Sequence, residues 1–250
     1  DDLGNRNTTA GDATAASARD PRIDDLEDGD DRILQVAGRR GFWHVFNDGT
    51  GEQTPGLYEA PLPSLGGLAG DGLAMHTSGN GFVDWGAGIE VDLNNPGSQV
   101  TDPRRASYDL NAYQGVSFQA RGSASTRLRF QAVTRAVATL DEGGRCDPSQ
   151  EGCFDTHGVD IELRDTWREF RVPFAALSQG GWGQQEDFDP RQVLAFAFQH
   201  IVQEDNVGSS FDFWLDDLVL YGPEMSSPLP HMDETTTNDF TPRAVPETTD

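Results

Sequence analysis

The sequence of 250 residues contains no lysine, and all 18 of its cationic residues are arginine. Aspartate and glutamate number 42, so the formal net charge at pH 7 is −24. A surface this acidic repels nucleic acid phosphates and anionic lipid, which argues against both as partners. It suits divalent cations, high salt or a secreted protein that must stay soluble. A GC-rich genome or a saline habitat would also explain the composition.

Long apolar runs are absent as well. No stretch of about 18 apolar residues occurs, so the sequence predicts no membrane-spanning helix. The chain opens with Asp1-Asp2-Leu3-Gly4 and shows no charged-then-apolar leader, as expected of a processed, secreted protein.

Cysteine is scarce, with Cys146 and Cys153 close together in a Gly-rich acidic loop. This spacing indicates a local disulfide, which forms in an oxidising compartment and predicts an extracellular or cell-surface location. The alternative is a zinc site made by the two cysteines and His157, but nothing nearby supplies a fourth ligand.

Short apolar runs separated by Gly, Pro, Asn and Asp fill the middle of the chain. They alternate with the two-residue period of strands, no amphipathic helix interrupts them, and Pro173 to Ser178 is short enough for one helical turn. The predicted strands are 41–46, 72–77, 87–93, 115–120, 126–133, 159–163, 167–172, 193–199 and 211–221. This pattern predicts an all-β sandwich or barrel.

The two ends differ from the middle in composition. Residues 1–20 are rich in Thr, Ala, Gly and Asp, and residues 223–250 are rich in Pro, Thr and acidic side chains. Neither segment buries enough apolar surface to fold alone, so we expect a low-complexity arm and tail around one domain at 21–222.

The strand predicted at 211–221 contains an anomaly. Strict alternation places Trp214, Asp216 and Leu218 on one face, which would point the Asp216 carboxylate at the core. A carboxylate in that position needs a partner that neutralises it.

Three stretches together resemble a known group of proteins: 23–29 (IDDLEDG), 165–174 (DTWREFRVPF) and 213–218 (FWLDDL). Their order and spacing are similar to those of the galactose-binding-like jelly-roll modules of the carbohydrate-binding superfamily. The family-11-type carbohydrate-binding modules and the related complex I assembly-factor domain look most similar. The resemblance spans roughly residues 21–222 and implies a jelly-roll β-sandwich. Because this superfamily also includes adhesins and structural domains, the fold does not decide the function.

The resemblance also implies a structural calcium ion that ties the first strand to the last. Carried over to this sequence, the ion would lie between Glu27 and Asp216, with Asp25 and Asp217 close by. Calcium binds hard oxygen ligands and would neutralise an inward carboxylate. The alternative is that these acids are solvated or pair with Arg22 or Arg32.

Glycan binding in such folds uses exposed aromatic rings that stack on sugars. The candidates outside the obvious strand cores are Trp43, Tyr58, Trp85, Tyr113 and Trp182. Trp182 is the only large apolar residue of a polar Gly-rich loop, although a buried role is the commoner use of tryptophan.

Catalysis has little support in the sequence. There is no Gly-x-Ser-x-Gly elbow, no His-Glu-x-x-His helix, no strand with closely spaced acids like those of the jelly-roll glycosidases, and the five histidines are scattered. We therefore expect a non-catalytic extracellular protein that binds a polysaccharide or other glycan. The alternative is a structural subunit whose terminal arms add strands to neighbouring copies and build a filament or surface layer.

Overall fold

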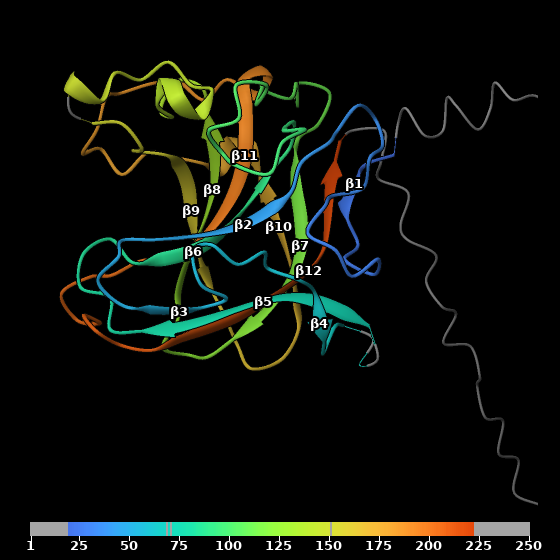
Figure 1. Cartoon of the computed structure of the whole chain (residues 1–250), viewed down its shortest axis with the longest axis vertical. Coiled ribbons are helices and arrows are strands. Elements are labelled where there is room, and N and C mark those ends of the chain that lie inside the picture. The colour runs from blue at the N-terminus through green and yellow to red at the C-terminus, as the bar shows by residue number, and fades with distance from the viewer. Residues whose placement is uncertain (1–19, 69, 71, 151, 223–250) are drawn as a thin grey trace, which may run out of the picture.

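The computed structural model describes residues 20–68, 70, 72–150 and 152–222 as two antiparallel sheets packed face to face (Figure 1). One sheet has the order β10-β7-β12-β5-β3, with β1 added beside β12 and β4 beside β5. The other has the order β2-β6-β11-β8-β9. The predicted arm and tail lie outside the described residues, apart from Asp20. None of the helices in these ranges has the length and apolarity that a membrane crossing requires.

The bounds of the elements are as follows. The seven-stranded sheet contains β1 (Arg22–Asp24), β3 (Glu52–Thr54), β4 (Ser64–Leu65), β5 (Leu73–Asn80), β7 (Gly115–Gly122), β10 (Arg168–Pro173) and β12 (Phe211–Tyr221). The five-stranded sheet contains β2 (Trp43–Asn47), β6 (Ala87–Asp92), β8 (Arg127–Thr134), β9 (His157–Glu162) and β11 (Val193–His200). Four short 3₁₀ turns complete the described chain: η1 (Leu140–Glu142), η2 (Pro148–Gln150), η3 (Phe174–Ala176) and η4 (Pro190–Gln192).

The chain crosses between the sheets at nearly every step from β5 to β12, and only β8 and β9 follow each other in one sheet. This alternation is that of a jelly roll, so the predicted jelly-roll β-sandwich is confirmed. Each of the nine predicted strands is present, and η3 lies within the predicted helical turn. The short strand β1 corresponds to the first strand that the resemblance implied. Strands β3 and β4 were not predicted, because each has at most three residues and little apolar character.

The core fills the space between the two sheets, where alternate residues of each strand point inward. Val116, Phe118 and Ala120 of β7 meet Phe196 and Phe198 of β11. The ring of Phe118 stands edge-on to that of Phe198 with 4.9 Å between centroids. Burying a phenylalanine side chain stabilises the fold by about 2 kcal/mol, so this row of rings holds the sheets together.

Strand β12 departs from the alternation predicted for it. Its pairing with β7 shifts register between Asp216 and Val219, and Asp217 has a positive φ of 48°, which marks a β-bulge. Before the bulge Phe211, Phe213 and Leu215 point inward, and after it Leu218 and Leu220 do.

The prediction that Asp216 shares a face with Leu218 and points into the core is therefore wrong. Asp216 lies on the same outer face of the sheet as Trp214, whose ring stacks on His76 with 4.0 Å between centroids. The Asp216 carboxylate is nevertheless only 4 % exposed, because the loop before β5 covers it and Leu68 N–H donates to its Oδ2 at 2.8 Å.

Candidate functional site

A cleft of about 610 Å³ lies on the face of the five-stranded sheet that points away from the core. A smaller hollow of about 260 Å³ adjoins it. Six residues line both spaces, so they form one groove: Trp85, Gln131, Phe154, Thr156, Trp182 and Gln199.

The floor of the cleft combines apolar and amide side chains from neighbouring strands. Phe46 of β2, Val133 of β8 and Ala197 of β11 provide the apolar part. Gln131 Nε2 donates to Gln199 Oε1 at 2.5 Å, and Gln199 Nε2 donates to the carbonyl oxygen of Trp85 at 2.8 Å. The floor can therefore contact an apolar surface and also exchange hydrogen bonds with hydroxyl groups.

Trp85 borders the cleft on the side of β2 and β6. It belongs to the loop between β5 and β6, is 43 % exposed, and its ring stacks on Phe46 with 6.1 Å between centroids. Gly86 follows with a φ of 100°, and a Cβ at that position would come within 2.1 Å of the His200 carbonyl oxygen. Glycine at 86 thus lets the chain turn tightly beneath the tryptophan.

Trp182 borders the cleft from the side of β8 and β9. It is 67 % exposed and lies in the loop that follows the bridge between Gly158 and Ser178. Cys153 and Phe154 form the adjacent wall. Cys146 and Cys153 are joined by a disulfide, which confirms that prediction. The zinc alternative is wrong, because neither sulfur is available as a thiolate and the His157 ring packs against Phe188.

The other three predicted aromatic residues lie outside the groove. Trp43 is 1 % exposed, stacks on Phe198 in the core, and donates from its indole nitrogen to Asp24, so its prediction as an exposed platform is wrong. Tyr113 is partly buried against the core. Tyr58 is fully exposed, but its neighbour Leu57 lines the cleft in its place.

A buried charged network lies at one end of the cleft. The Arg105 side chain is 1 % exposed and contacts Glu90 at 2.6 Å and Asp92 at 2.5 Å. Glu142 approaches the same guanidinium at 3.9 Å. Burial, reinforced by the charge of Glu90, raises the pKa of Glu142 to about 7, and burial lowers the pKa of His44 to about 4. Glu90, Glu142 and His44 all face the cleft, so its polar end is lined by carboxyl groups and a neutral imidazole.

The four carboxylates predicted to hold calcium gather where β1 runs beside β12. Asp216 Oδ1 accepts from Asp217 N–H at 2.8 Å, and Glu27 Oε1 accepts from Leu73 N–H at 3.1 Å. Asp25 pairs with Arg22 at 3.2 Å, as the alternative prediction allowed. In the described part of the chain no arginine or histidine forms an ion pair with Glu27, Asp216 or Asp217.

The electrostatics of this acidic edge favour a cation. Burial, followed by the charge of Asp217, raises the pKa of Asp216 to about 6. Burial, followed by the charge of Asp25, raises the pKa of Asp217. The donor chemistry is thus that of a hard cation. However, among the described residues no three His, Cys, Asp or Glu side chains are arranged as a metal site.

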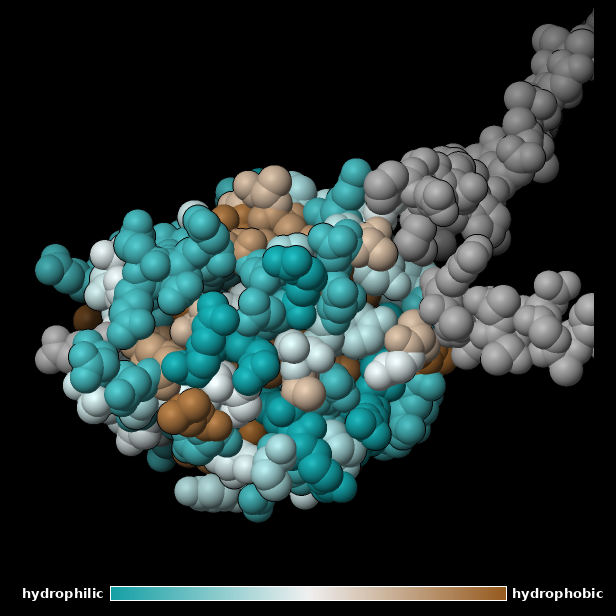
Figure 2. Space-filling model, turned by 90° about the horizontal axis from the view of Figure 1, so that it is seen from above, coloured by the Kyte–Doolittle hydropathy of each residue, from teal (hydrophilic) through white to brown (hydrophobic). Residues whose placement is uncertain are grey.

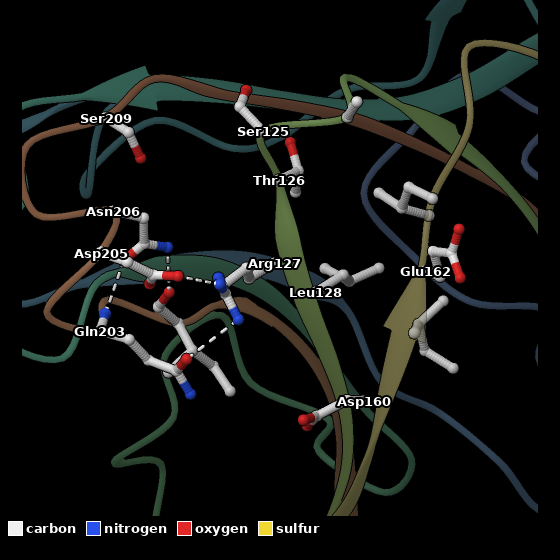
Figure 3. Close-up of a pocket in the computed structure, with 14 residues that line it drawn as sticks. Ser125, Thr126, Arg127, Leu128, Asp160, Glu162, Gln203, Asp205, Asn206 and Ser209 are labelled. Atoms are coloured by element: carbon white, nitrogen blue, oxygen red, sulfur yellow. Dashed lines mark hydrogen bonds and ion pairs between the residues drawn. The ribbon is translucent and has the colours of Figure 1, made fainter.

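A third hollow of about 540 Å³ lies at one end of the sandwich (Figure 3). It is lined by Ser125 to Leu128, the end of β9 and the loop after β11. Arg127 pairs there with Asp205 and donates to Gln203 at 3.0 Å. Because its lining contains no aromatic ring, it lacks a stacking surface, and the groove on the five-stranded sheet remains the better candidate.

Figure 2 shows a mostly hydrophilic face with hydrophobic residues scattered over it.

Sequence reasoning missed the floor of the groove. Phe46, Gln131 and Gln199 lie in strands that were predicted correctly, and alternation from their inward neighbours places all three on the outer face. The signal was therefore present. The sequence alone did not reveal which of the two sheets carries the groove.

The chain has distant similarities to known proteins in sequence and in structure. No protein-family model matches the chain. Endoglucanase 3 of Fibrobacter succinogenes is 24% identical over 177 residues, which are 71% of this chain and 24% of that protein. The chain thus spans about a quarter of the length of the curated relative that it matches.

Among solved structures, a family 11 carbohydrate-binding module of Clostridium thermocellum in complex with a β-1,3-1,4-mixed-linked tetrasaccharide shares 16% identity, with a TM-score of 0.47, over 72% of this chain and 88% of that one. The family 11 module of a cellulosomal cellulase of the same organism shares 14% identity, with a TM-score of 0.48, over 77% and 92%.

Proposed function

We propose that this protein binds a polysaccharide chain in the groove on the five-stranded sheet and does not cleave it. The observation that carries the proposal is the pair of partly exposed tryptophans, Trp85 and Trp182, which border one groove from two sides. Sugar rings have apolar faces that stack on indoles and hydroxyl groups that pair with amides and carboxylates. Gln131 and Gln199 supply the amides between the two rings.

A linear chain suits the groove better than a single sugar. The main cleft and the adjoining hollow share both tryptophans, Val100 and Glu142 line the main cleft alone, and Arg129 and Val202 line the hollow alone. Several sugar units can lie along such a path. The similarity to part of an endoglucanase also favours a role beside polysaccharide chemistry.

Affinity electrophoresis of the folded chain in gels containing soluble β-glucans, xylans and mannans tests the proposal. We expect retardation by at least one polymer, and loss of retardation in Trp85→Ala and Trp182→Ala. Trp167→Ala is the matched control, because Trp167 lies near Arg121 on the other sheet. Retardation that survives in both groove variants would contradict the proposal. Release of new reducing ends from a retarding polymer would contradict the non-catalytic part.

We also propose a calcium ion at the edge where β1 meets β12. The support is the cluster of Glu27, Asp216 and Asp217, which lack cationic partners among the described residues. Backbone carbonyl groups and water would have to complete the shell, because calcium takes roughly six to eight oxygen ligands. The ion would be structural, since it would fasten the first strand to the last.

An extracellular or cell-surface location is part of the same proposal. It is supported by the Cys146–Cys153 disulfide, because such bonds persist in oxidising compartments. Assembly into a filament through the terminal arms stays a prediction, since those segments lie outside the described residues. Size-exclusion chromatography of the intact chain with and without its two ends would test it.

A further inference from the structure

Each tryptophan of the groove belongs to a loop whose backbone is held by one aspartate from a different segment. Asp155 does this for Trp182, and Asp48 does it for Trp85. We propose that these two aspartates are positioning residues that preorganise the two aromatic rings for ligand. The proposal rests on the function proposed above and adds how that site is kept in shape.

Asp155 is 1 % exposed and directs its whole carboxylate at the Trp182 loop. Its Oδ1 accepts from Gly180 N–H at 2.7 Å. Its Oδ2 accepts from Gly181 N–H at 2.9 Å and from Gly183 N–H at 3.0 Å. The three donors surround Trp182 in the chain, so one carboxylate fixes the backbone on both sides of the exposed ring. Hydrogen bonds to an ionised carboxylate are about twice as strong as neutral ones.

The glycines of this loop are needed for the close approach. A Cβ at Gly183 would come within 2.5 Å of Asp155 Cβ and of the Gly152 carbonyl oxygen. Gly181 has a φ of 84°, a conformation that residues with side chains rarely adopt. Gln179 completes the attachment by donating to the Asp155 carbonyl oxygen at 2.7 Å.

Asp48 makes the corresponding contacts on the other side of the groove. Its Oδ2 accepts from Asp84 N–H at 3.2 Å and from Gly86 N–H at 2.7 Å, the two residues that flank Trp85. Its Oδ1 accepts from the Thr50 hydroxyl at 2.6 Å, and Thr50 Oγ1 in turn accepts from Val83 N–H at 2.9 Å. The turn after β2 thus holds the whole loop that carries Trp85.

Preorganisation matters for ligand affinity because an exposed ring on a loose loop must be ordered when the ligand binds. Neither aspartate needs to touch the ligand to have this effect. Removing one aspartate should therefore weaken ligand binding as much as removing the tryptophan whose loop it holds. It should not affect the contribution of the other tryptophan. This pairing distinguishes positioning from a general contribution to folding.

A crossed set of variants tests the pairing with the polysaccharide that the wild-type protein binds best. We expect Asp155→Ala to weaken binding about tenfold or more, comparable to Trp182→Ala. The double variant D155A/W182A should bind no more weakly than W182A alone, whereas D155A/W85A should show the product of the two single losses. Asp48→Ala should behave in the same way toward Trp85. Asp165→Asn, an exposed aspartate elsewhere, is the control.

Hydrogen exchange measured without ligand provides the second readout. In the wild type we expect slow exchange for the amides of Gly180, Gly181 and Gly183, and faster exchange in D155A with no change at Asp84 and Gly86. D48A should give the opposite pattern. If either alanine variant fails to fold, Asp155→Asn and Asp48→Asn, which keep one acceptor oxygen and the side-chain volume, replace it.

Three results would overturn the proposal: unchanged exchange in the loop that faces the altered aspartate, multiplicative losses within a matched pair, or full affinity in D155A and D48A. If the wild-type protein binds no polysaccharide at all, the proposed function fails. The exchange data then still decide whether the aspartates hold the two loops.

Discussion

The indole Nε1–H of Trp43 donates to Oδ2 of Asp24 at 2.7 Å, and both side chains are 1 % exposed. Trp43 begins β2 in one sheet and Asp24 ends β1 in the other, so this hydrogen bond crosses the core. Burial raises the pKa of Asp24 to about 7, although the hydrogen bonds from Trp43 and the Leu26 amide act against it.

Trp43→Phe should therefore destabilise the fold. The change removes the donor from a buried carboxylate and leaves a small cavity, which together cost about 2–4 kcal/mol in the free energy of unfolding. Urea unfolding followed by circular dichroism measures the loss. Trp167→Phe, on the outer face of the other sheet, is the control and should cost less than about 1 kcal/mol. Equal stability of Trp43→Phe and the wild type would refute the role of the hydrogen bond.

The metal-free protein should lose stability between pH 6.5 and 8. Burial raises the folded-state pKa of Asp24 and of Glu142 to about 7, whereas in the unfolded chain both groups have ordinary values near 4. Their stabilising contribution is full below the unfolded values and is lost as pH rises through 7. His44 and His200 have folded pKa values of about 4 and are neutral in the folded state throughout this window. In the unfolded chain they titrate near 6.5, so they offset part of the loss at the lower end of the window.

We expect the net decrease to amount to about 1 kcal/mol in the free energy of unfolding, measured by urea unfolding in EDTA at several pH values. Glu142→Gln should reduce the slope, because it removes one of the two groups. A free energy of unfolding that is constant or rises over this range would be inconsistent with raised folded-state pKa values at Asp24 and Glu142.

Calcium should raise the melting temperature, and EDTA should lower it again. Because ionised carboxylates bind calcium, the increase should become larger as pH rises through the pKa of Asp216, which is about 6. Asp216→Asn should remove most of the response, whereas Asp165→Asn should keep it. A melting temperature that is the same in calcium and in EDTA would show that the acidic edge holds no structural calcium ion.

Removing the disulfide should destabilise the protein and weaken glycan binding. A bond between residues 7 apart restrains the unfolded chain by about 2–3 kcal/mol. The Cys146→Ser/Cys153→Ser variant should show this loss in urea unfolding. Binding should weaken less than in Trp182→Ala, because Asp155 still holds the Trp182 loop. Wild-type affinity in the serine variant would show that Cys153 and Phe154 need no support from the bond.

Strand positions were predictable because apolar alternation and the Gly, Pro and Asn residues between runs depend on local sequence. The resemblance implied that the first strand lies against the last, and β1 pairs with β12, with Asp24 opposite Leu218. The disulfide followed from a short spacing between two cysteines. These features need no knowledge of what lies across the molecule.

The features that were missed depend on distant contacts. Trp43 lies in a predicted strand, and its burial follows only from the contacts with Asp24 and Phe198, which are distant in the sequence. The bulge of β12 depends on a positive φ at Asp217, which no rule of alternation predicts for an aspartate. The hydrogen bonds by which Asp155 holds the Trp182 loop connect residues that are 25 to 28 positions apart in the sequence.

The bulge in β12 makes the length of this strand more important than its composition. Before the bulge the odd-numbered residues point into the core, and after it the even-numbered residues do. The change occurs at Asp216 and Asp217. Substitution at either position alters charge and leaves the phase intact. Deletion of a single residue there would shift the register of the second half of β12 by one residue. Leu218 and Leu220 would then point to solvent and be lost from the core.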